Sequence, residues 1–154
     1  MRFDDWILSK KYGTKKVTPE CTQLLHENGE TSHFYTREST AQNKIELPES
    51  INFLFENFDG IDLFSSTFKI CSNKNPVSIN GVDLISPISE MAYRMSEVDF
   101  PEPAIPFMNE TGNWIYAASL KSNCIYSFDI EYGDIEKHDS VYEIIENWIN
   151  ATED

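Results

Sequence analysis

The sequence predicts an α+β domain in which a mainly antiparallel sheet lies against helices. Two patterns in the last third of the chain indicate this class. Between residues 104 and 135, strand-like apolar runs alternate with short turn sequences, which is typical of neighbouring antiparallel strands. Directly afterwards, residues 140–149 have the pattern of an amphipathic helix, and the apolar side of such a helix needs a surface to pack on. The preceding strands would supply that surface.

The closing helix has the clearest local signal. Ser140 and Glu143 match the S-x-x-E capping box, in which the hydroxyl accepts from a backbone N–H of the first turn and the acid reaches back. Apolar residues then recur at helical spacing as far as Ile149.

The first 44 residues predict two short helices and a loop. Apolar residues at positions 3, 6 and 7 predict a short opening helix. Residues 18–20, Thr-Pro-Glu, have the form of a helix start, so a second helix is expected from there to Gly29. Residues 30–44 are mostly polar, and we expect a loop there with one short element.

The middle of the chain predicts two more helices and several strands. Residues 47–58 carry a proline at the start and one apolar stripe at helical spacing. Strand-like runs follow between residues 63 and 85, with a turn at Asn80-Gly81. Residues 86–97 repeat the helix pattern, and three prolines within residues 99–106 then favour an extended connection.

Length and composition indicate one globular domain over residues 1–154. The chain has 13% aromatic residues, seven prolines and six glycines, which suits a packed core. Its three cysteines form no C-x-x-C pair, so neither a disulfide framework nor a zinc cluster is indicated. No apolar run resembles a signal peptide or a membrane span, and we expect a cytoplasmic protein.

The negative charge is concentrated in the C-terminal two thirds. Residues 1–44 contain seven basic and six acidic residues, whereas residues 45–154 contain five and twenty, for net charges of +1 and −15. Such a surface repels phosphate backbones and anionic membranes and attracts a basic protein partner. The same charge also serves solubility, so the acidic surface is either a solvated face or a docking face.

The densest run of acids gives the candidate site. Asp129, Glu131, Asp134 and Glu136 fall on a predicted hairpin, where they form a solvated sheet edge, a patch that docks a protein, or a catalytic or metal site. Trp114 follows a nearby glycine turn and is either an exposed anchor for a partner or a core residue.

Catalytic and cofactor motifs are not recognisable in the sequence. The three histidines are scattered without metal-ligand spacing, and no phosphate-binding glycine loop or G-x-S-x-G elbow occurs. Cys124 is interpreted as a buried structural cysteine, with a nucleophile as the alternative if a histidine lies near it. We therefore expect no enzyme activity, no metal and no cofactor.

Short motifs occur in a defined order between residues 45 and 150. They are Leu47-Pro48, Ile51, Leu54-Phe55, Asp59-Gly60, Ile105-Pro106-Phe107, the turn at residues 112–115, the strand at residues 125–131, and the helix at residues 140–148. In order and spacing they resemble the SUKH superfamily of Smi/Knr-type proteins. Residues 1–44 differ from that family, since the usual helix does not run directly into Leu47-Pro48.

The resemblance implies an α+β domain with a mainly antiparallel sheet flanked by N-terminal helices and a C-terminal helix, and no enzymatic activity. Bacterial members are mostly immunity proteins that neutralise toxins, often nucleases, whereas fungal relatives act as signalling scaffolds. The leading hypothesis is an immunity protein whose contacts include Trp114 and the acids of the hairpin, with a toxin as partner and neither nucleic acid nor membrane. A regulatory scaffold is the alternative, and a small enzyme is the least favoured.

Overall fold

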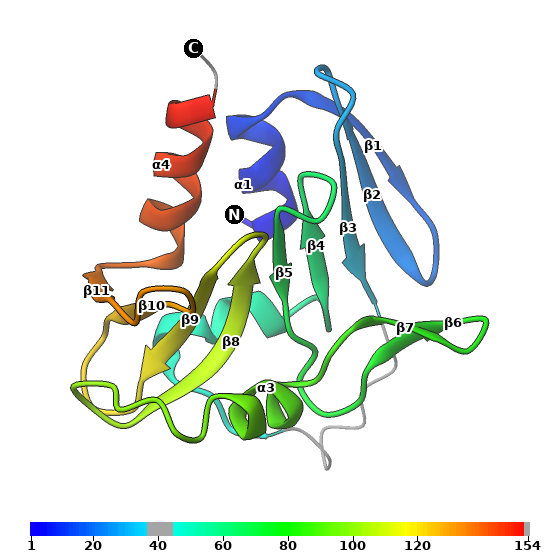
Figure 1. Cartoon of the computed structure of the whole chain (residues 1–154). Coiled ribbons are helices and arrows are strands. Elements are labelled where there is room, and N and C mark those ends of the chain that lie inside the picture. Colours follow the sequence, from blue (N-terminus) through cyan, green and yellow to red (C-terminus); the bar gives the residue numbers. More distant parts are fainter. Residues whose placement is uncertain (37–44, 153–154) are drawn as a thin grey trace.

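The chain forms one large antiparallel sheet that curves around two of its helices (Figure 1). The computed structural model describes residues 1–36 and 45–152. The strands of the large sheet are β1 (Gly13–Val17), β2 (Cys21–His26), β3 (Thr31–Tyr35), β4 (Ile61–Leu63), β5 (Phe68–Ile70), β8 (Ala104–Glu110), β9 (Trp114–Ser119), β10 (Ile125–Asp129) and β11 (Ile135–His138).

These nine strands lie side by side in the order in which they occur along the chain, and each neighbouring pair is antiparallel. Between β5 and β8 the chain leaves the sheet. It forms a separate hairpin of β6 (Val77–Ile79) and β7 (Val82–Ile85), and then helix α3 (Ile88–Arg94). This arrangement leaves β1 and β11 as the two edges of the large sheet.

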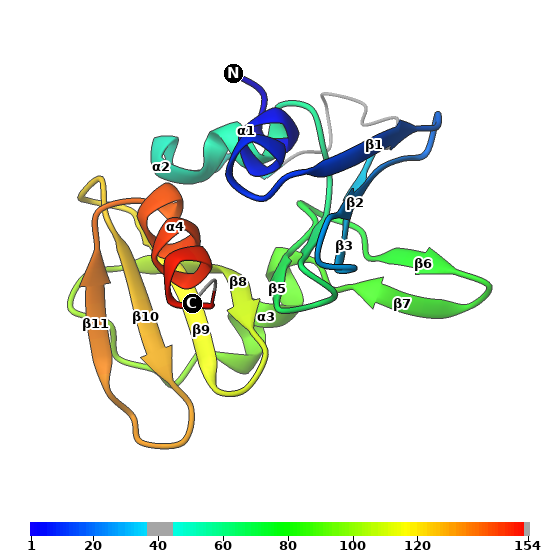
Figure 2. The ribbon, with the colours of Figure 1, turned by 90° about the horizontal axis from the view of Figure 1, so that it is seen from above.

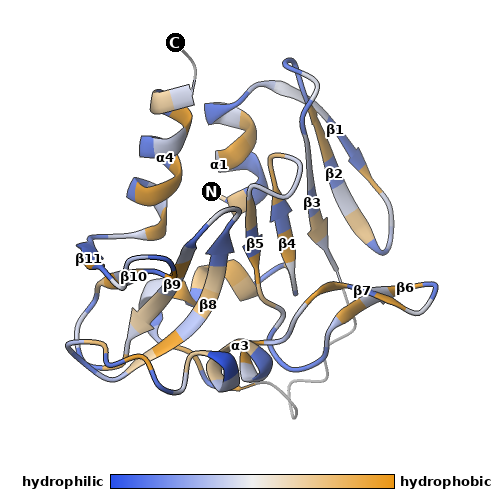
Figure 3. Ribbon diagram, in the orientation of Figure 1, coloured by the Kyte–Doolittle hydropathy of each residue, from blue (hydrophilic) through white to orange (hydrophobic). Residues whose placement is uncertain are grey.

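The inner side of the curved sheet faces α1 (Phe3–Lys10) and α4 (Val141–Thr152), as Figure 2 shows from above. A short helix, α2 (Glu49–Asn52), continues as a 3-10 turn over Phe53–Phe55 and lies beside α1. Hydrophobic and hydrophilic residues alternate along α4 in Figure 3, as expected for a helix with one buried side.

Aromatic side chains join the helices to the sheet. The ring of Phe3 on α1 lies 6.1 Å from that of Phe34 on β3, and Trp148 on α4 lies 4.8 Å from Phe64 and 5.7 Å from Phe68. Phe34, Phe64 and Phe68 are fully buried. Since burying one such side chain contributes about 2–3 kcal/mol, these contacts hold both helices firmly on the sheet.

One continuous hydrophobic core runs from residues of α1 to residues of α4. The described chain is therefore a single α+β domain with an antiparallel sheet, an N-terminal helix and a C-terminal helix, which confirms the predicted fold class.

The outer side of the sheet is covered in part by α3, which packs against β8, and by the connection that follows α3. In that connection Phe100 contacts the rings of Tyr126 and Phe128 on β10, at 6.4 and 6.5 Å. Glu102 accepts hydrogen bonds from the hydroxyls of Tyr126 (2.6 Å) and Ser122 (2.7 Å). These contacts hold the proline-rich segment against β10 on the outer side of the sheet.

The predicted helix over residues 18–29 is wrong, because this segment contains strand β2. Burial alternates along it, with Thr22, Leu24 and His26 buried and Leu25 51% exposed, which is the period of a strand. The Thr18 hydroxyl donates to the Cys21 carbonyl and also accepts from the Cys21 N–H, so it closes a turn instead of capping a helix.

Several other elements agree with the sequence patterns. The helices expected over residues 47–58 and 86–97 form, although they are shorter, and α4 begins with a hydrogen bond from the Glu143 N–H to the Ser140 hydroxyl (3.2 Å). The short element expected within residues 30–44 is β3, and residues 37–44 lie outside the described part. The segment from residue 61 to residue 85 forms two hairpins, β4–β5 and β6–β7, so the run from Leu63 to Ile70, expected as one strand, is divided by a turn.

Candidate functional site

The candidate acids lie on the hairpin formed by β10, β11 and the turn at residues 130–134, which we name the acidic hairpin. Because β11 is an edge strand of the large sheet, the acidic hairpin stands at the margin of the molecule. From Asp129 to His138 the acidic hairpin holds four acidic residues and one lysine, Lys137. This edge therefore carries a strong local negative charge.

Asp129 builds the turn of the acidic hairpin. Its side-chain Oδ1 accepts hydrogen bonds from the backbone N–H groups of Glu131 (2.9 Å) and Tyr132 (3.2 Å), and the residue is 7% exposed. Its backbone carbonyl also accepts from the Gly133 N–H at 2.7 Å. Asp129 thus stabilises the backbone of the turn and presents little surface to a partner.

Glu131, Asp134 and Glu136 are exposed, so they are the members of the predicted set that a partner can reach. Glu131 is positioned by a hydrogen bond from the side-chain amide of Asn113, 2.8 Å from its Oε2. Asn113 also accepts a backbone hydrogen bond from Ile130 (2.7 Å), which joins the β8–β9 turn to the acidic hairpin. Hydrogen bonds to Asp129 and to Asn113 therefore hold the acidic turn in place.

Trp114 lies directly opposite Asp129 in the pairing of β9 with β10. It is partly buried and packs against the hydrophobic core. Its other neighbour in the register, Glu110, accepts a hydrogen bond from the Tyr116 hydroxyl at 2.8 Å. Burial and this carboxylate raise the pKa of Tyr116, so its hydroxyl stays protonated and remains a donor.

Two exposed apolar side chains extend the predicted site. Tyr132 is 73% exposed and Ile130 is 53% exposed, and both belong to the turn that Asp129 organises. Sequence reasoning missed them because the apolar residues of a turn look like the ends of the adjoining strands. The sequence did hold a signal for them: directly after Asp129, apolar Ile130 and Tyr132 alternate with Glu131. Tyrosine is enriched at protein interfaces and among the residues that contribute most of their binding energy.

The histidines are placed in three separate environments. The Oγ of Ser127 lies 2.8 Å from Nε2 of His138, but Ser127 is 1% exposed and its hydroxyl is out of reach of a substrate. His26 is buried, with Nδ1 2.8 Å from the Lys11 carbonyl and Nε2 2.8 Å from the Ser32 hydroxyl. His33 stacks on Tyr35, with ring centroids 6.1 Å apart.

The cysteines are free thiols. Burial raises the pKa of Cys71 to about 12 and also raises the pKa of Cys21, so both thiols stay protonated at neutral pH. Cys124 is buried, in agreement with its interpretation as a structural residue, and its Sγ lies 3.9 Å from Oε1 of Glu102.

Within residues 1–36 and 45–152, no group of three or more His, Cys, Asp or Glu side chains is arranged to hold a metal ion. None of the helices in this part of the chain is long and apolar enough to cross a lipid bilayer.

Lys11 is an unexpected buried charge on the inner side of the sheet. Its ammonium group lies 2.6 Å from the Glu30 carboxylate, 4.9 Å from the centroid of the Trp148 ring and 5.1 Å from that of Phe64. With this ion pair and two cation–π contacts, Lys11 joins the segment after α1 to the β2–β3 turn, the β4–β5 turn and α4, which is a structural role.

Comparison of the chain with models of known protein families, with curated proteins and with solved structures found no match.

Proposed function

We propose that this protein is a non-enzymatic immunity protein that binds a cognate bacterial toxin domain through the acidic hairpin and blocks its active site. The observation that supports this proposal most is the turn of the acidic hairpin at a sheet edge. In this hairpin Glu131, Asp134 and Glu136 are exposed together with Tyr132. The SUKH-like order of motifs between residues 45 and 150 supports the same proposal.

The charge of the acidic hairpin suits a partner that acts on nucleic acid. A nuclease carries a basic groove for the phosphate backbone of its substrate, and a row of carboxylates can occupy that groove in place of phosphates. Charge complementarity mainly accelerates association, whereas buried aromatic contacts slow dissociation. We assign the first role to Glu131, Asp134 and Glu136, and the second to Tyr132 and Ile130.

The edge position also supports one kind of contact over another. An edge strand offers unpaired backbone groups to another chain, but charged side chains along it oppose simple strand addition. β11 carries Glu136 and Lys137, both exposed. The partner is therefore recognised by side chains of the turn and not by extension of the sheet.

We place the action of the protein in the cytoplasm. Its three free cysteines suit a reducing compartment, and a toxin that attacks nucleic acid has its target there.

A growth-rescue assay tests the proposal. A candidate toxin domain, sought at the end of a neighbouring upstream gene, is expressed under an inducible promoter, together with this protein or one of its variants. We expect the wild-type chain to restore growth and the triple variant Glu131→Lys, Asp134→Lys, Glu136→Lys to fail. Asp129 is left unchanged, because its carboxylate holds the turn.

The matched control reverses three exposed acids elsewhere, Glu46, Glu56 and Glu97, and should still protect. Equal protection by both triple variants would show that the acidic hairpin is not the contact. Failure of the wild-type chain to protect, with capture of host proteins instead, would favour a regulatory scaffold.

A further inference from the structure

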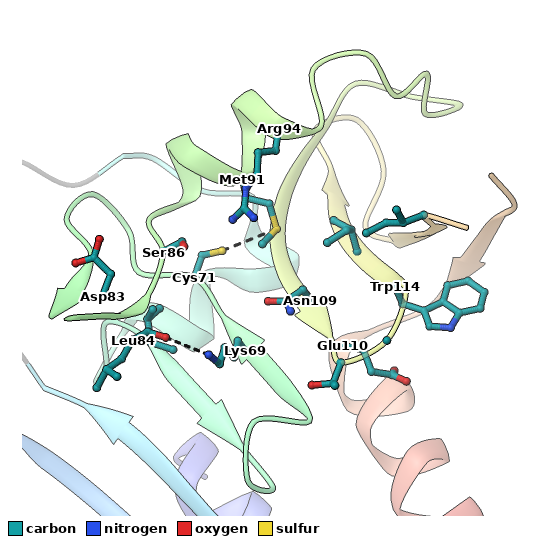
Figure 4. A pocket seen from close by; sticks show the side chains of 15 residues that line it. Lys69, Cys71, Asp83, Leu84, Ser86, Met91, Arg94, Asn109, Glu110 and Trp114 are labelled. Atoms are coloured by element: carbon teal, nitrogen blue, oxygen red, sulfur yellow. Dashed lines mark hydrogen bonds between the residues drawn. The ribbon is translucent and has the colours of Figure 1, made fainter. Parts of the chain in front are cut away.

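A cleft of about 350 Å³ opens on the outer side of the sheet, away from α1 and α4 (Figure 4). One wall is formed by β7 and α3, and the other by the outward-facing side chains of β5, β8 and β9. Its volume falls within the range of about 300–1,000 Å³ that is usual for small-molecule sites. The cleft is separate from the acidic hairpin's exposed carboxylates, none of which lines it.

Two cations from opposite walls line the cleft. Lys69 stands on β5, opposite Asn109 of β8, and its ammonium group donates to the Leu84 carbonyl at 3.4 Å. Because an ammonium group has three donors, Lys69 retains donors for a ligand. Figure 4 shows Arg94 extending from α3 toward the same space. The Arg94 guanidinium lies 3.9 Å from Glu90, an exposed pair one helical turn apart that is only weakly held.

The carboxylates around the cleft make their hydrogen bonds elsewhere. Asp83 accepts from the Ser78 hydroxyl within the β6–β7 hairpin, and Glu110 accepts from Tyr116 on the inner side of the sheet. Asp62, opposite Lys69 in the β4–β5 pairing, accepts from the N–H (2.7 Å) and hydroxyl (2.8 Å) of Ser66. The two cations are therefore left to face the cleft without a close carboxylate partner across it.

The cleft is lined by two cations and by two carboxylates, Asp83 and Glu110, in a part of the chain that is otherwise strongly acidic. Residues 45–152 contain five basic and eighteen acidic residues, and two of the five basic side chains line this cleft. The remaining walls include apolar side chains, namely Ile85, Met91, Ile115 and Ile130. Cations beside apolar walls match a ligand with one anionic group and an apolar body.

We propose that this cleft binds a small organic carboxylate, with its carboxylate group held by Lys69 and Arg94 and its apolar body against Ile85, Met91 and Ile115. The side-chain amide of Asn109, on the wall formed by β8, supplies a further donor. Ile130 of the acidic hairpin's turn also lines the cleft, but none of the residues assigned to the carboxylate ligand belongs to the acidic hairpin, so this site can be tested without a toxin.

Phenylacetate is a suitable probe, with phenylacetamide as its neutral isostere and inorganic phosphate as an anion without an apolar body. Binding is followed on the full chain by amide chemical shifts in heteronuclear NMR. We expect phenylacetate to shift the amide signals of Lys69, Asn109 and Ile115 saturably, whereas phenylacetamide and phosphate do not.

Two variants test the cations. Arg94→Gln, on an exposed helix surface, should lower the affinity for phenylacetate about tenfold, and Lys69→Met should do the same. Lys121→Gln, outside the cleft, should leave the affinity unchanged.

Three results would overturn the proposal. The first is the absence of saturable shifts with phenylacetate. The second is equal binding of phenylacetamide or phosphate, which would show that the carboxylate or the apolar body is not recognised. The third is unchanged affinity in Arg94→Gln, which keeps the test decisive even if Lys69→Met fails to fold.

Discussion

The carboxylate of Asp129 accepts a hydrogen bond from the backbone N–H of Glu131 at 2.9 Å, so a buried acid fixes the position of an exposed one. The two residues belong to the same acidic run in the sequence and have different roles in the fold. Asp129 shapes the turn, and Glu131 is available to a partner.

Replacing Asp129 separates these roles. Asp129→Ala removes the acceptor for the N–H groups of Glu131 and Tyr132 and should lower the free energy of unfolding by about 2 kcal/mol. Asp129→Asn retains a side-chain oxygen at the same place, so it should lower the free energy of unfolding by less than half of that amount. Urea denaturation of the three proteins measures both values. Equal stability of Asp129→Ala and wild type would contradict the structural role.

The Lys11–Glu30 pair should show energetic coupling. Lys11→Met and Glu30→Gln each leave one partly buried charge without its partner. Each variant should therefore lower the free energy of unfolding by about 2 kcal/mol. The double variant should be more stable than the sum of the two losses implies, by about 1 kcal/mol. A double-mutant cycle from urea denaturation gives the coupling, and simple additivity would show that the two side chains do not interact.

His26 should make stability fall on mild acidification. Burial lowers the pKa of His26 below its ordinary 6.5, although the hydrogen bond to the Lys11 carbonyl partly opposes this. The unfolded chain therefore binds a proton at a higher pH than the folded chain does. Stability from this residue is fully present above pH 6.5 and is lost as the pH falls from 6.5 toward the lower folded value.

The measurement is the free energy of unfolding across that pH range. His26→Asn keeps a neutral donor for the Lys11 carbonyl and should flatten the slope. An unchanged slope in this variant would assign the effect to other groups.

At lower pH, Glu30 causes a second loss of stability. Burial would raise its pKa, but hydrogen bonds from Lys11 and Asn28 outweigh burial and hold the pKa below 4.5. Its contribution disappears as the pH falls through that lowered value.

Tyr132 should matter for binding and not for folding. Because it is 73% exposed, Tyr132→Ala should change the free energy of unfolding by less than about 0.5 kcal/mol. Dissociation from the toxin domain should become about tenfold faster or more, as for an aromatic anchor. Tyr93→Ala is the matched control, since Tyr93 is 82% exposed on α3. Similar dissociation rates for the two variants would remove Tyr132 from the contact.

The sequence predicted α4 and the strands around it because their stabilising contacts are local. The Ser140 and Glu143 capping pair and the turn at Gly133 are both encoded within a few residues. β2 could not be predicted in the same way. Its buried polar residue His26 is satisfied by Lys11 and Ser32, which lie in other segments, so the strand period was hidden.

The candidate site was predicted in part. Charge drew attention to residues 129–136, yet composition alone does not distinguish an acid that makes a turn from one that faces solvent. Asp129 and Glu131 differ only through backbone geometry. The cleft beside Lys69 and Arg94 was not predicted, because these residues are 25 positions apart and meet only when α3 packs on the sheet.

The most direct test of the central claim is the association rate constant with the toxin domain, measured by stopped-flow as a function of salt concentration. For the wild-type chain we expect fast association that slows steeply with salt, because the acidic hairpin steers the encounter. The variant with lysine at positions 131, 134 and 136 should associate at least about tenfold more slowly at low salt, with little salt dependence. The control reversing Glu46, Glu56 and Glu97 should keep most of the wild-type rate. Identical rates and salt slopes for wild type and the hairpin variant would contradict the account.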